Sequence, residues 1–160
     1  HDQNEALTFA ERVVVMYDGH VVQVGTPQEL FAAPAHTFVG YFIGSPGMNL
    51  LPAVTADGAI RVPGTDLALA DMAAPDGAAK LELGIRPEFL EVIDGADVDT
   101  IELPLEQVDD LGNFRLAHLR LGDHRIVAKV EEGRALGGDR CHVRFPRAFT
   151  KLYADSRLVT

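Results

Sequence analysis

The sequence predicts a mainly β protein that begins with a short α/β segment. Residues 1–45 combine two β-branched runs around Asp18-Gly19 with stretches of helical spacing. From Met48 onward, short alternating apolar runs are separated by Gly, Pro and Asp, which is typical of an all-β barrel or sandwich. The string GSPG at 44–47 interrupts both patterns. We therefore expect two parts, residues 1–45 and 46–160.

Local signals predict a hairpin and several short helices in the first part. Asp2 can cap a helix over residues 3–10. Asp18-Gly19 predicts a two-residue turn, because both central positions of a type I′ turn need positive φ. Thr26-Pro27 begins the next helix, which ends at Pro34, and residues 35–43 have the spacing of another.

The run Val13–Val15 is typical of a strand covered on both faces. Nothing else in residues 1–45 suggests a second covering layer, so we expect the strand pair to pack on a sheet outside the chain. The apolar side chains of residues 5–43 would then lack their cover, and we expect the chain to self-associate, as a twofold or swapped dimer. The side chains concerned include Leu7, Phe9, Val13–Val15, Leu30 and Phe31.

The second part predicts a series of short strands. We expect them at 49–55, 59–62, 66–69, 80–86, 100–109, 113–121, 124–131 and 139–146. The clearest is FRLAHLRL, in which Ala117, Leu119 and Leu121 share one face of the strand and the alternate residues share the other. Gly122-Asp123 predicts the turn into the next strand.

Composition excludes several classes of function. The net charge is −10 and the 14 basic residues are scattered, which argues against nucleic acid as a partner. No apolar run approaches the roughly 20 residues that span a bilayer, and we expect no signal peptide. The single cysteine, Cys141, indicates a reducing compartment and a role in core packing. The histidines show no ligand spacing, so we expect no metal site.

Two strings carry a resemblance to a known family. Residues 1–51, from HDQNEALTF to GSPGMNLL, resemble the end of an ABC-transporter ATPase domain, of the importer branch for sugars and related polyols, entered at the switch histidine. LGIRPEFL at 83–90 is typical of the C-terminal TOBE region of these ATPases, which holds one or two OB-like barrels. The sequence departs from the family at Asn4, where Val is common, and at Phe89, where His is common.

The resemblance implies an OB-like (TOBE) β-barrel regulatory domain at 46–160 after the end of a nucleotide-binding domain at 1–45. It implies that His1 reaches the γ-phosphate of ATP in the complete ATPase, with Mg²⁺ as the accompanying ion. The chain has no G-x-x-x-x-G-K-[ST] motif, so we expect no cofactor site and no ATP hydrolysis from these 160 residues alone.

The same resemblance implies partners and a location. These are a second copy of the subunit, transporter membrane subunits, and a periplasmic or extracellular solute-binding protein. The subunit would lie on the cytoplasmic face of the plasma (inner) membrane, held there by its partners. The strings IGSPGMNLL and DLGNFRLAHLRL favour the glycerol-3-phosphate and sugar subgroup.

The candidate site residues of the second part are Gly84, Arg86, Pro87 and Glu88. Pro87 fixes a bend after the 80–86 strand and removes a hydrogen-bond donor from it. Arg86 and Glu88 flank this bend, and we expect them to brace it through carbonyl hydrogen bonds or ion pairs, with ligand contact as the alternative.

A second hypothesis for function is a stand-alone module that binds oxyanions between paired OB-like domains. Such a site needs backbone N–H groups with Ser, Thr or Lys around it. The dispersed basic residues and the two serines argue against it.

Overall fold

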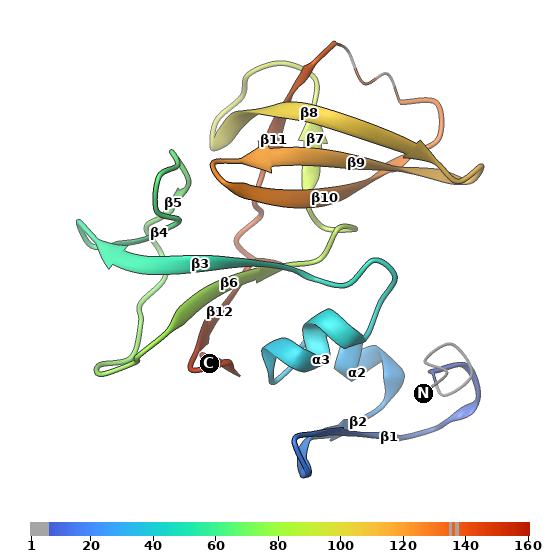
Figure 1. Cartoon of the computed structure of the whole chain (residues 1–160), viewed down its shortest axis with the longest axis vertical. Helices are drawn as coiled ribbons and strands as arrows, with labels where there is room; N and C mark the ends of the chain where they lie inside the picture. The colour runs from blue at the N-terminus through green and yellow to red at the C-terminus, as the bar shows by residue number, and fades with distance from the viewer. Residues whose placement is uncertain (1–6, 135, 137) are drawn as a thin grey trace.

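The structure, a computed structural model, describes residues 7–134, 136 and 138–160. It forms three layers (Figure 1): a hairpin at the base, a pair of short helices above it, and the strands that make up the remainder. The hairpin and helices are β1 (Val13–Tyr17), β2 (His20–Gly25), α2 (Pro27–Ala32) and α3 (Thr37–Phe42). The other strands are β3 (Asn49–Ala56), β4 (Ala59–Arg61), β5 (Ala68–Leu69), β6 (Leu81–Ile85), β7 (Glu91–Ile93), β8 (Thr100–Asp110), β9 (Phe114–Leu121), β10 (His124–Glu131), β11 (Arg140–Arg144), β12 (Lys151–Ala154) and β13 (Arg157–Leu158).

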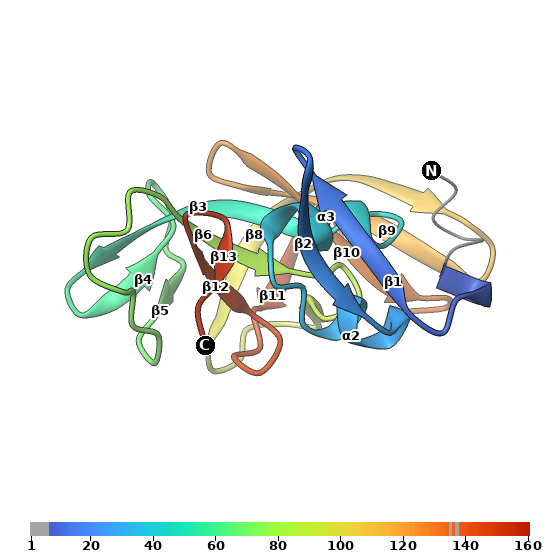
Figure 2. The same ribbon diagram turned by 90° about the horizontal axis from the view of Figure 1, so that it is seen from below.

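These strands confirm the mainly β class. They pair antiparallel in a five-stranded sheet, ordered β10-β9-β8-β11-β7, and a six-stranded sheet, ordered β13-β12-β6-β3-β4-β5. Seen from below (Figure 2), the hairpin runs across α2 and α3, while β4 and β5 lie at the opposite end of the molecule. No helix of the described residues is long and apolar enough to cross a membrane.

The described residues form two separate apolar cores. The large one lies between the two sheets and takes buried side chains from most of their strands, among them Leu51, Leu83, Leu119 and Ile126. The small one joins the hairpin to the helices, with Val15, Leu30, Val39 and Ile43 at its centre. Each sheet hides one face in the large core, and the hairpin hides one face in the small core.

Several local predictions are confirmed. Asp18 and Gly19 form the hairpin turn, with φ of 49° and 75°. Thr26 caps α2 in a capping box with Glu29, whose side chain accepts from the Thr26 N–H at 2.8 Å. In β9, Ala117, Leu119 and Leu121 are buried while the alternate residues are only partly so. Cys141 is a buried free thiol.

Other expectations are wrong or untested. The sequence prediction misses β7, β12 and β13, and the strand expected at 66–69 covers only Ala68–Leu69. Residues 7–9 are helical, whereas His1, Asp2 and the start of the expected 3–10 helix lie outside the described residues.

The expected exposure of the whole apolar segment is also wrong. Leu30 and Val15 are buried, because α2 and α3 supply the covering layer that the sequence did not suggest. The other face of the hairpin remains open: Val14 is 55% exposed and its cross-strand neighbour Val24 is 45% exposed. Only one face of Val13–Val15 is therefore covered within this chain.

The alternation in β9 predicts how the two faces of that strand contribute to stability. Leu119→Ala leaves a cavity where the side chain is fully buried in the large core. We expect it to lower the free energy of unfolding by about 2–5 kcal/mol. The matched control is Leu116→Ala, on the partly exposed face of the same strand, and its loss should be much smaller. Chemical denaturation of both variants measures this, and equal losses would contradict the placement of the core.

Candidate functional site

The candidate residues of the GIRPE string lie at the junction of the two cores. β6 ends at Ile85, and the chain then turns at once, because the Arg86 carbonyl accepts from the N–H groups of Phe89 and Leu90 at 3.0 and 3.2 Å. The Pro87 carbonyl accepts from the N–H of Lys129 in β10 at 2.8 Å. The bend that Pro87 imposes thus carries the chain from one sheet to the edge of the other.

Arg86 points from this bend toward the helices and is only 3% exposed. Its Nε donates to the Phe31 carbonyl at 2.6 Å, and its Nη1 donates to the Ile43 carbonyl at 2.5 Å. Longer contacts reach the carbonyls of Gly40, at 3.4 Å, and Leu30, at 3.5 Å. The guanidinium therefore reaches the carboxyl ends of α2 and α3 together.

These acceptors explain how a buried cation is tolerated. The last four carbonyls of a helix have no partner within the helix, and their dipoles favour a positive charge. The guanidinium carbon also lies 3.9 Å above the centre of the Phe31 ring, a cation–π contact. Burial lowers the pKa of Arg86, while the nearby Glu88 carboxylate raises it. Arginine remains protonated in such surroundings.

Gly84 has a packing role, whereas Glu88 has one carboxylate oxygen without a hydrogen bond among the described residues. A Cβ atom built on Gly84 would lie 2.7 Å from Met48 Cε and 2.8 Å from Tyr153 Cε2, so a larger residue here would force these side chains to shift. Glu88 Oε2 is buried and accepts no hydrogen bond from the described residues. Arg86 makes none of the ion pairs found among those residues, so main-chain carbonyls are its hydrogen-bonding partners.

Residues that the sequence did not single out complete this junction. The Tyr153 hydroxyl in β12 donates to the Pro34 carbonyl at 3.0 Å, and burial raises the pKa of this phenol, which keeps it a neutral donor. The Leu158 N–H donates to the Ala35 carbonyl at 3.0 Å, and the Thr37 N–H donates to the Ser156 carbonyl at 2.9 Å. The contacts that Arg86, β12, β13 and the turn between these two strands make with residues 30–43 form what we call the joint.

The helices are tied to the hairpin as well. Gln23 of β2 donates to the Ala33 carbonyl at 3.0 Å and accepts from the Ala35 N–H at 2.8 Å. His36 caps α3 by accepting from the Phe38 N–H at 3.1 Å, and burial lowers its pKa, which favours the neutral, accepting imidazole. The hairpin and the two helices thus form one body, joined by the small core.

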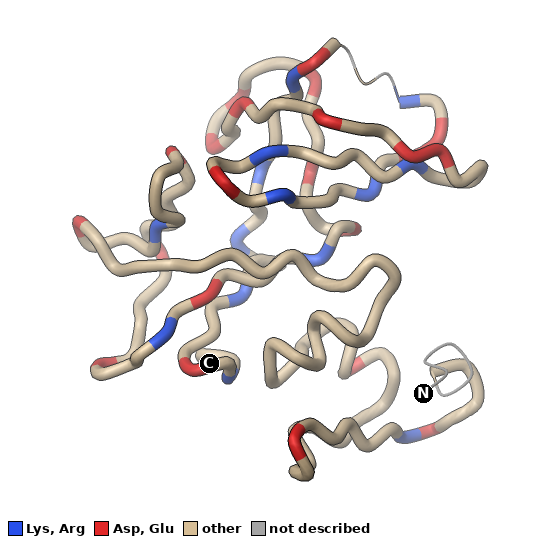
Figure 3. The backbone as a smooth tube through the Cα atoms, viewed as in Figure 1, with Lys and Arg blue, Asp and Glu red and all other residues tan. Residues whose placement is uncertain are grey.

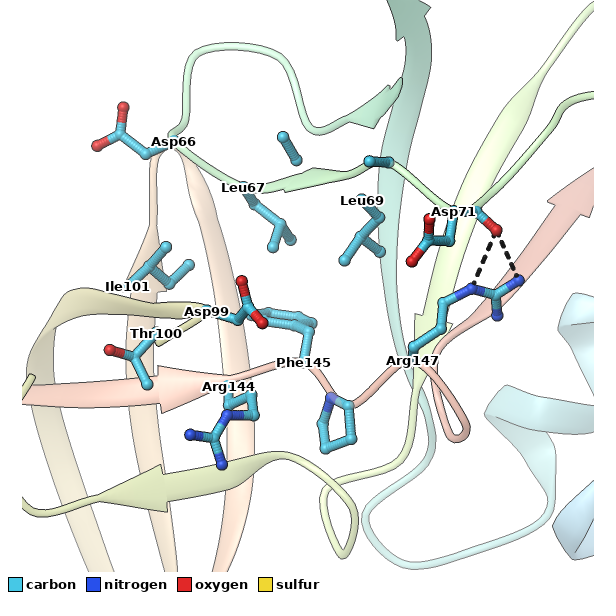
Figure 4. A pocket seen from close by; sticks show the side chains of 13 residues that line it. Asp66, Leu67, Leu69, Asp71, Asp99, Thr100, Ile101, Arg144, Phe145 and Arg147 are labelled. Atoms are coloured by element: carbon cyan, nitrogen blue, oxygen red, sulfur yellow. Dashed lines mark hydrogen bonds between the residues drawn. The ribbon is translucent and has the colours of Figure 1, made fainter. Parts of the chain in front are cut away.

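A cavity of about 420 Å³ lies elsewhere, between β5 and the end of β11. Figure 4 shows Leu67, Leu69 and Phe145 along it, with the carboxylates of Asp71 and Asp99 turned toward its centre. Arg147 donates hydrogen bonds from Nε and Nη2 to the main-chain carbonyl of Asp71.

The second arginine of this wall, Arg144, donates hydrogen bonds to the carboxylates of Glu91 and Asp97 at 3.0 and 2.6 Å. The charged groups left free along the cavity wall are therefore carboxylates, which repel an oxyanion.

Charges on the five-stranded sheet form pairs rather than patches. Figure 3 shows acidic residues along β8 and basic residues along the neighbouring β9 and β10. Glu106 lies 2.7 Å from Arg120 and 3.4 Å from Arg125, and Asp109 lies 2.7 Å from His118. The basic side chains of this face are therefore paired with carboxylates of β8.

Comparison with known proteins agrees with this architecture. The MalK OB fold domain family matches residues 44–90, which include Gly84, Arg86, Pro87 and Glu88. Similar proteins include those named sn-glycerol-3-phosphate import ATP-binding protein UgpC from Chromohalobacter salexigens, Bordetella avium and Salmonella typhi.

The identities are substantial over most of the chain. The Chromohalobacter protein is 45% identical over 163 residues, 98% of this chain and 43% of that protein. The Bordetella avium protein is 40% identical over 132 residues, which cover 81% of this chain and 36% of that protein. The Salmonella typhi protein is 39% identical over 155 residues, which cover 91% of this chain and 42% of that protein.

The chain belongs with the C-terminal regions of ABC-importer ATP-binding subunits. It spans less than half the length of these curated relatives. The family match begins at residue 44, two residues after the end of α3.

The joint predicts that a single hydroxyl contributes measurably to stability. Tyr153→Phe keeps the buried ring but leaves the Pro34 carbonyl without its donor. We expect the free energy of unfolding to fall by about 1 kcal/mol. Tyr41→Phe removes a hydroxyl from an exposed side chain and serves as the control. Thermal or denaturant unfolding distinguishes the two variants. A Tyr153→Phe variant as stable as the parent would contradict a stabilising hydrogen bond from Tyr153 to Pro34.

Proposed function

We propose that this chain is the regulatory and dimer-stabilising C-terminal part of an ATPase subunit that powers import of a sugar or a glycerol-3-phosphate-like solute. The observation that carries the proposal is the similarity of this chain to proteins named as import ATP-binding proteins, and its construction from two bodies supports it. A hairpin-and-helix body with an open apolar face is bonded to a separate β domain.

In this proposal the hairpin body is the end of the nucleotide-binding domain and residues 46–160 are the regulatory domain. The open face of the hairpin, with Val14 and Val24 side by side, is suited to pack on a sheet from a preceding part of a longer chain. The relatives are more than twice as long as the segment that they share with this chain, so they have room for such a part.

The chemistry of the complete subunit would be ATP hydrolysis with Mg²⁺. His1 would donate a hydrogen bond to the charge that develops on the γ-phosphate. The proposed partners are a second copy of the subunit, the membrane subunits of the importer and its solute-binding protein. Through these partners the subunit would reside on the cytoplasmic face of the inner membrane.

The role of His1 can be tested in the longer protein. We expect His1→Ala to lower the rate of ATP hydrolysis about 100-fold, the size of effect seen when one preorganised donor is lost. His20→Ala is the control, because His20 is an exposed residue at the hairpin turn and should leave the rate unchanged. A steady-state phosphate-release assay measures both, and an equal rate in His1→Ala would refute the assignment of His1.

The open hairpin face predicts how the 160-residue chain behaves alone. We expect it to self-associate at micromolar concentration, since exposed apolar surface is buried where it can be. Val14→Lys combined with Val24→Lys places two charges on this face and should yield a monomer. Light scattering after size exclusion measures the mass, and a monomeric wild-type chain would contradict the prediction.

A further inference from the structure

The cavity between β5 and the end of β11 is lined by parts of both large sheets. Residues 66–71, which include β5, form one wall, and residues 99–101 with 144–147 form the other. Its volume of about 420 Å³ is in the range of small-molecule sites, which are mostly apolar with a few converging polar groups. Leu67 and Phe145, each only 5% exposed, supply apolar surface, and Leu69 extends it. A ligand here would therefore contact an apolar surface between the two sheets.

The free charge of the cavity wall is negative. Asp66, Asp71 and Asp99 line it, and none of the three takes part in the ion pairs found among the described residues. Both arginines of the wall already donate to carboxylate or carbonyl oxygens of the chain itself. Unpaired carboxylates beside engaged guanidinium groups favour a cationic ligand over an anionic one.

The arrangement of these carboxylates suits an organic cation better than a metal ion. Among the residues that the structure describes, no group of three His, Cys, Asp or Glu side chains could hold a metal ion. In Figure 4, Leu69 and Phe145 lie between the carboxylates of Asp71 and Asp99. An inorganic cation at either carboxylate would leave this apolar surface uncovered. A hydrocarbon body with an ammonium group at each end matches the order of acidic, apolar and acidic surface.

We propose that this cavity binds a small organic cation, an amine with an apolar body, and that aliphatic diamines are the class that fits it best. The hydrocarbon body would cover Leu69 and Phe145, and the two ammonium groups would lie near Asp71 and Asp99. Because the walls belong to different sheets, the bound amine would bridge the six-stranded and the five-stranded sheet. The site would give the second part of the chain a small-molecule ligand of its own.

The exposure of the carboxylates sets the expected affinity. Asp71 and Asp99 are both exposed, so water and salt screen their attraction for an ammonium group. Each such ion pair then strengthens binding only about two- to fivefold. We therefore expect a dissociation constant of about 1 mM for a five-carbon diamine, and weaker binding at high ionic strength.

A titration of the 160-residue chain followed by ¹⁵N–¹H NMR tests the charge and the body of the ligand separately. The probes 1,5-diaminopentane, 5-amino-1-pentanol and 1,5-pentanediol share one body and carry two, one and no ammonium groups. We expect the diamine to shift the amides of Leu69 and Thr100, the amino alcohol to bind about two- to fivefold more weakly, and the diol to give no saturable shift. The shorter 1,3-diaminopropane keeps both charges and should bind at least about threefold more weakly than diaminopentane. A diol that binds as tightly as the diamine, or equal binding of the two diamines, would overturn the proposal.

Substitutions locate the site on the cavity wall. Asp71→Asn and Asp99→Asn each remove one charge at nearly constant shape, and Asn readily adopts the φ of 58° found at Asp99. We expect each to weaken binding of diaminopentane about two- to fivefold, and the double variant to combine both losses. The matched control is Glu132→Gln, which removes one charge from an exposed residue outside the cavity wall and should leave the dissociation constant unchanged. An equal loss in Glu132→Gln would overturn the proposal, because amines would then respond to the net charge of the chain.

The probe series uses the unaltered chain, so the test survives if one of the variants fails to fold. Neither experiment involves ATP. Loss of the proposed function would appear in the phosphate-release assay of the longer protein, whereas failure of the amine site would appear in the titrations. The two ideas can therefore fail separately.

Discussion

The arrangement of this chain depends on how a buried guanidinium is satisfied. Arg86 brings a positive charge to a place with almost no solvent contact, and it finds no ion-paired carboxylate there among the described residues. It is satisfied instead by carbonyls at the ends of two short helices and by the face of Phe31. Because a cation without such partners would be very costly to bury, the helices and the β domain are committed to each other at this point.

This commitment explains the shape of the neighbouring residues. Gly44 and Gly84 are positions where any Cβ would enter space taken by Arg86, Met48 or Tyr153. Pro87 ends β6 and turns the chain to β10, so that Arg86 stands at the corner between the two sheets and the helices. The GIRPE string thus has a structural role, because it connects the two sheets to the helices α2 and α3.

The two-core construction bears on function in a way that a single core would not. Under the proposed function, the small core would belong to the ATPase domain and the large core to the regulatory domain. The two bodies are joined by hydrogen bonds around one cation and also by an apolar contact, because the Phe31 and Phe89 rings lie edge to face with 6.2 Å between their centres. The open apolar face of the hairpin lies at one end of the molecule, and the paired charges of the five-stranded sheet lie at the other.

Short-range signals in the sequence were sufficient for the elements that depend on neighbouring residues. The Asp18-Gly19 turn, the Thr26 cap and the alternation in β9 each involve residues within a few positions, so the sequence determined them. The resemblance in residues 1–51 and 83–90 likewise identified the family. What only the tertiary structure decided are pairings over long separations. β12 and β13 are short and do not alternate, and they exist because β6 and residues 35–37 lie beside them. The partners of Arg86 lie 43 to 56 positions away, and no local pattern marks a carbonyl as an acceptor. Every peptide carries the same carbonyl, so folding alone selects which four of them surround the cation.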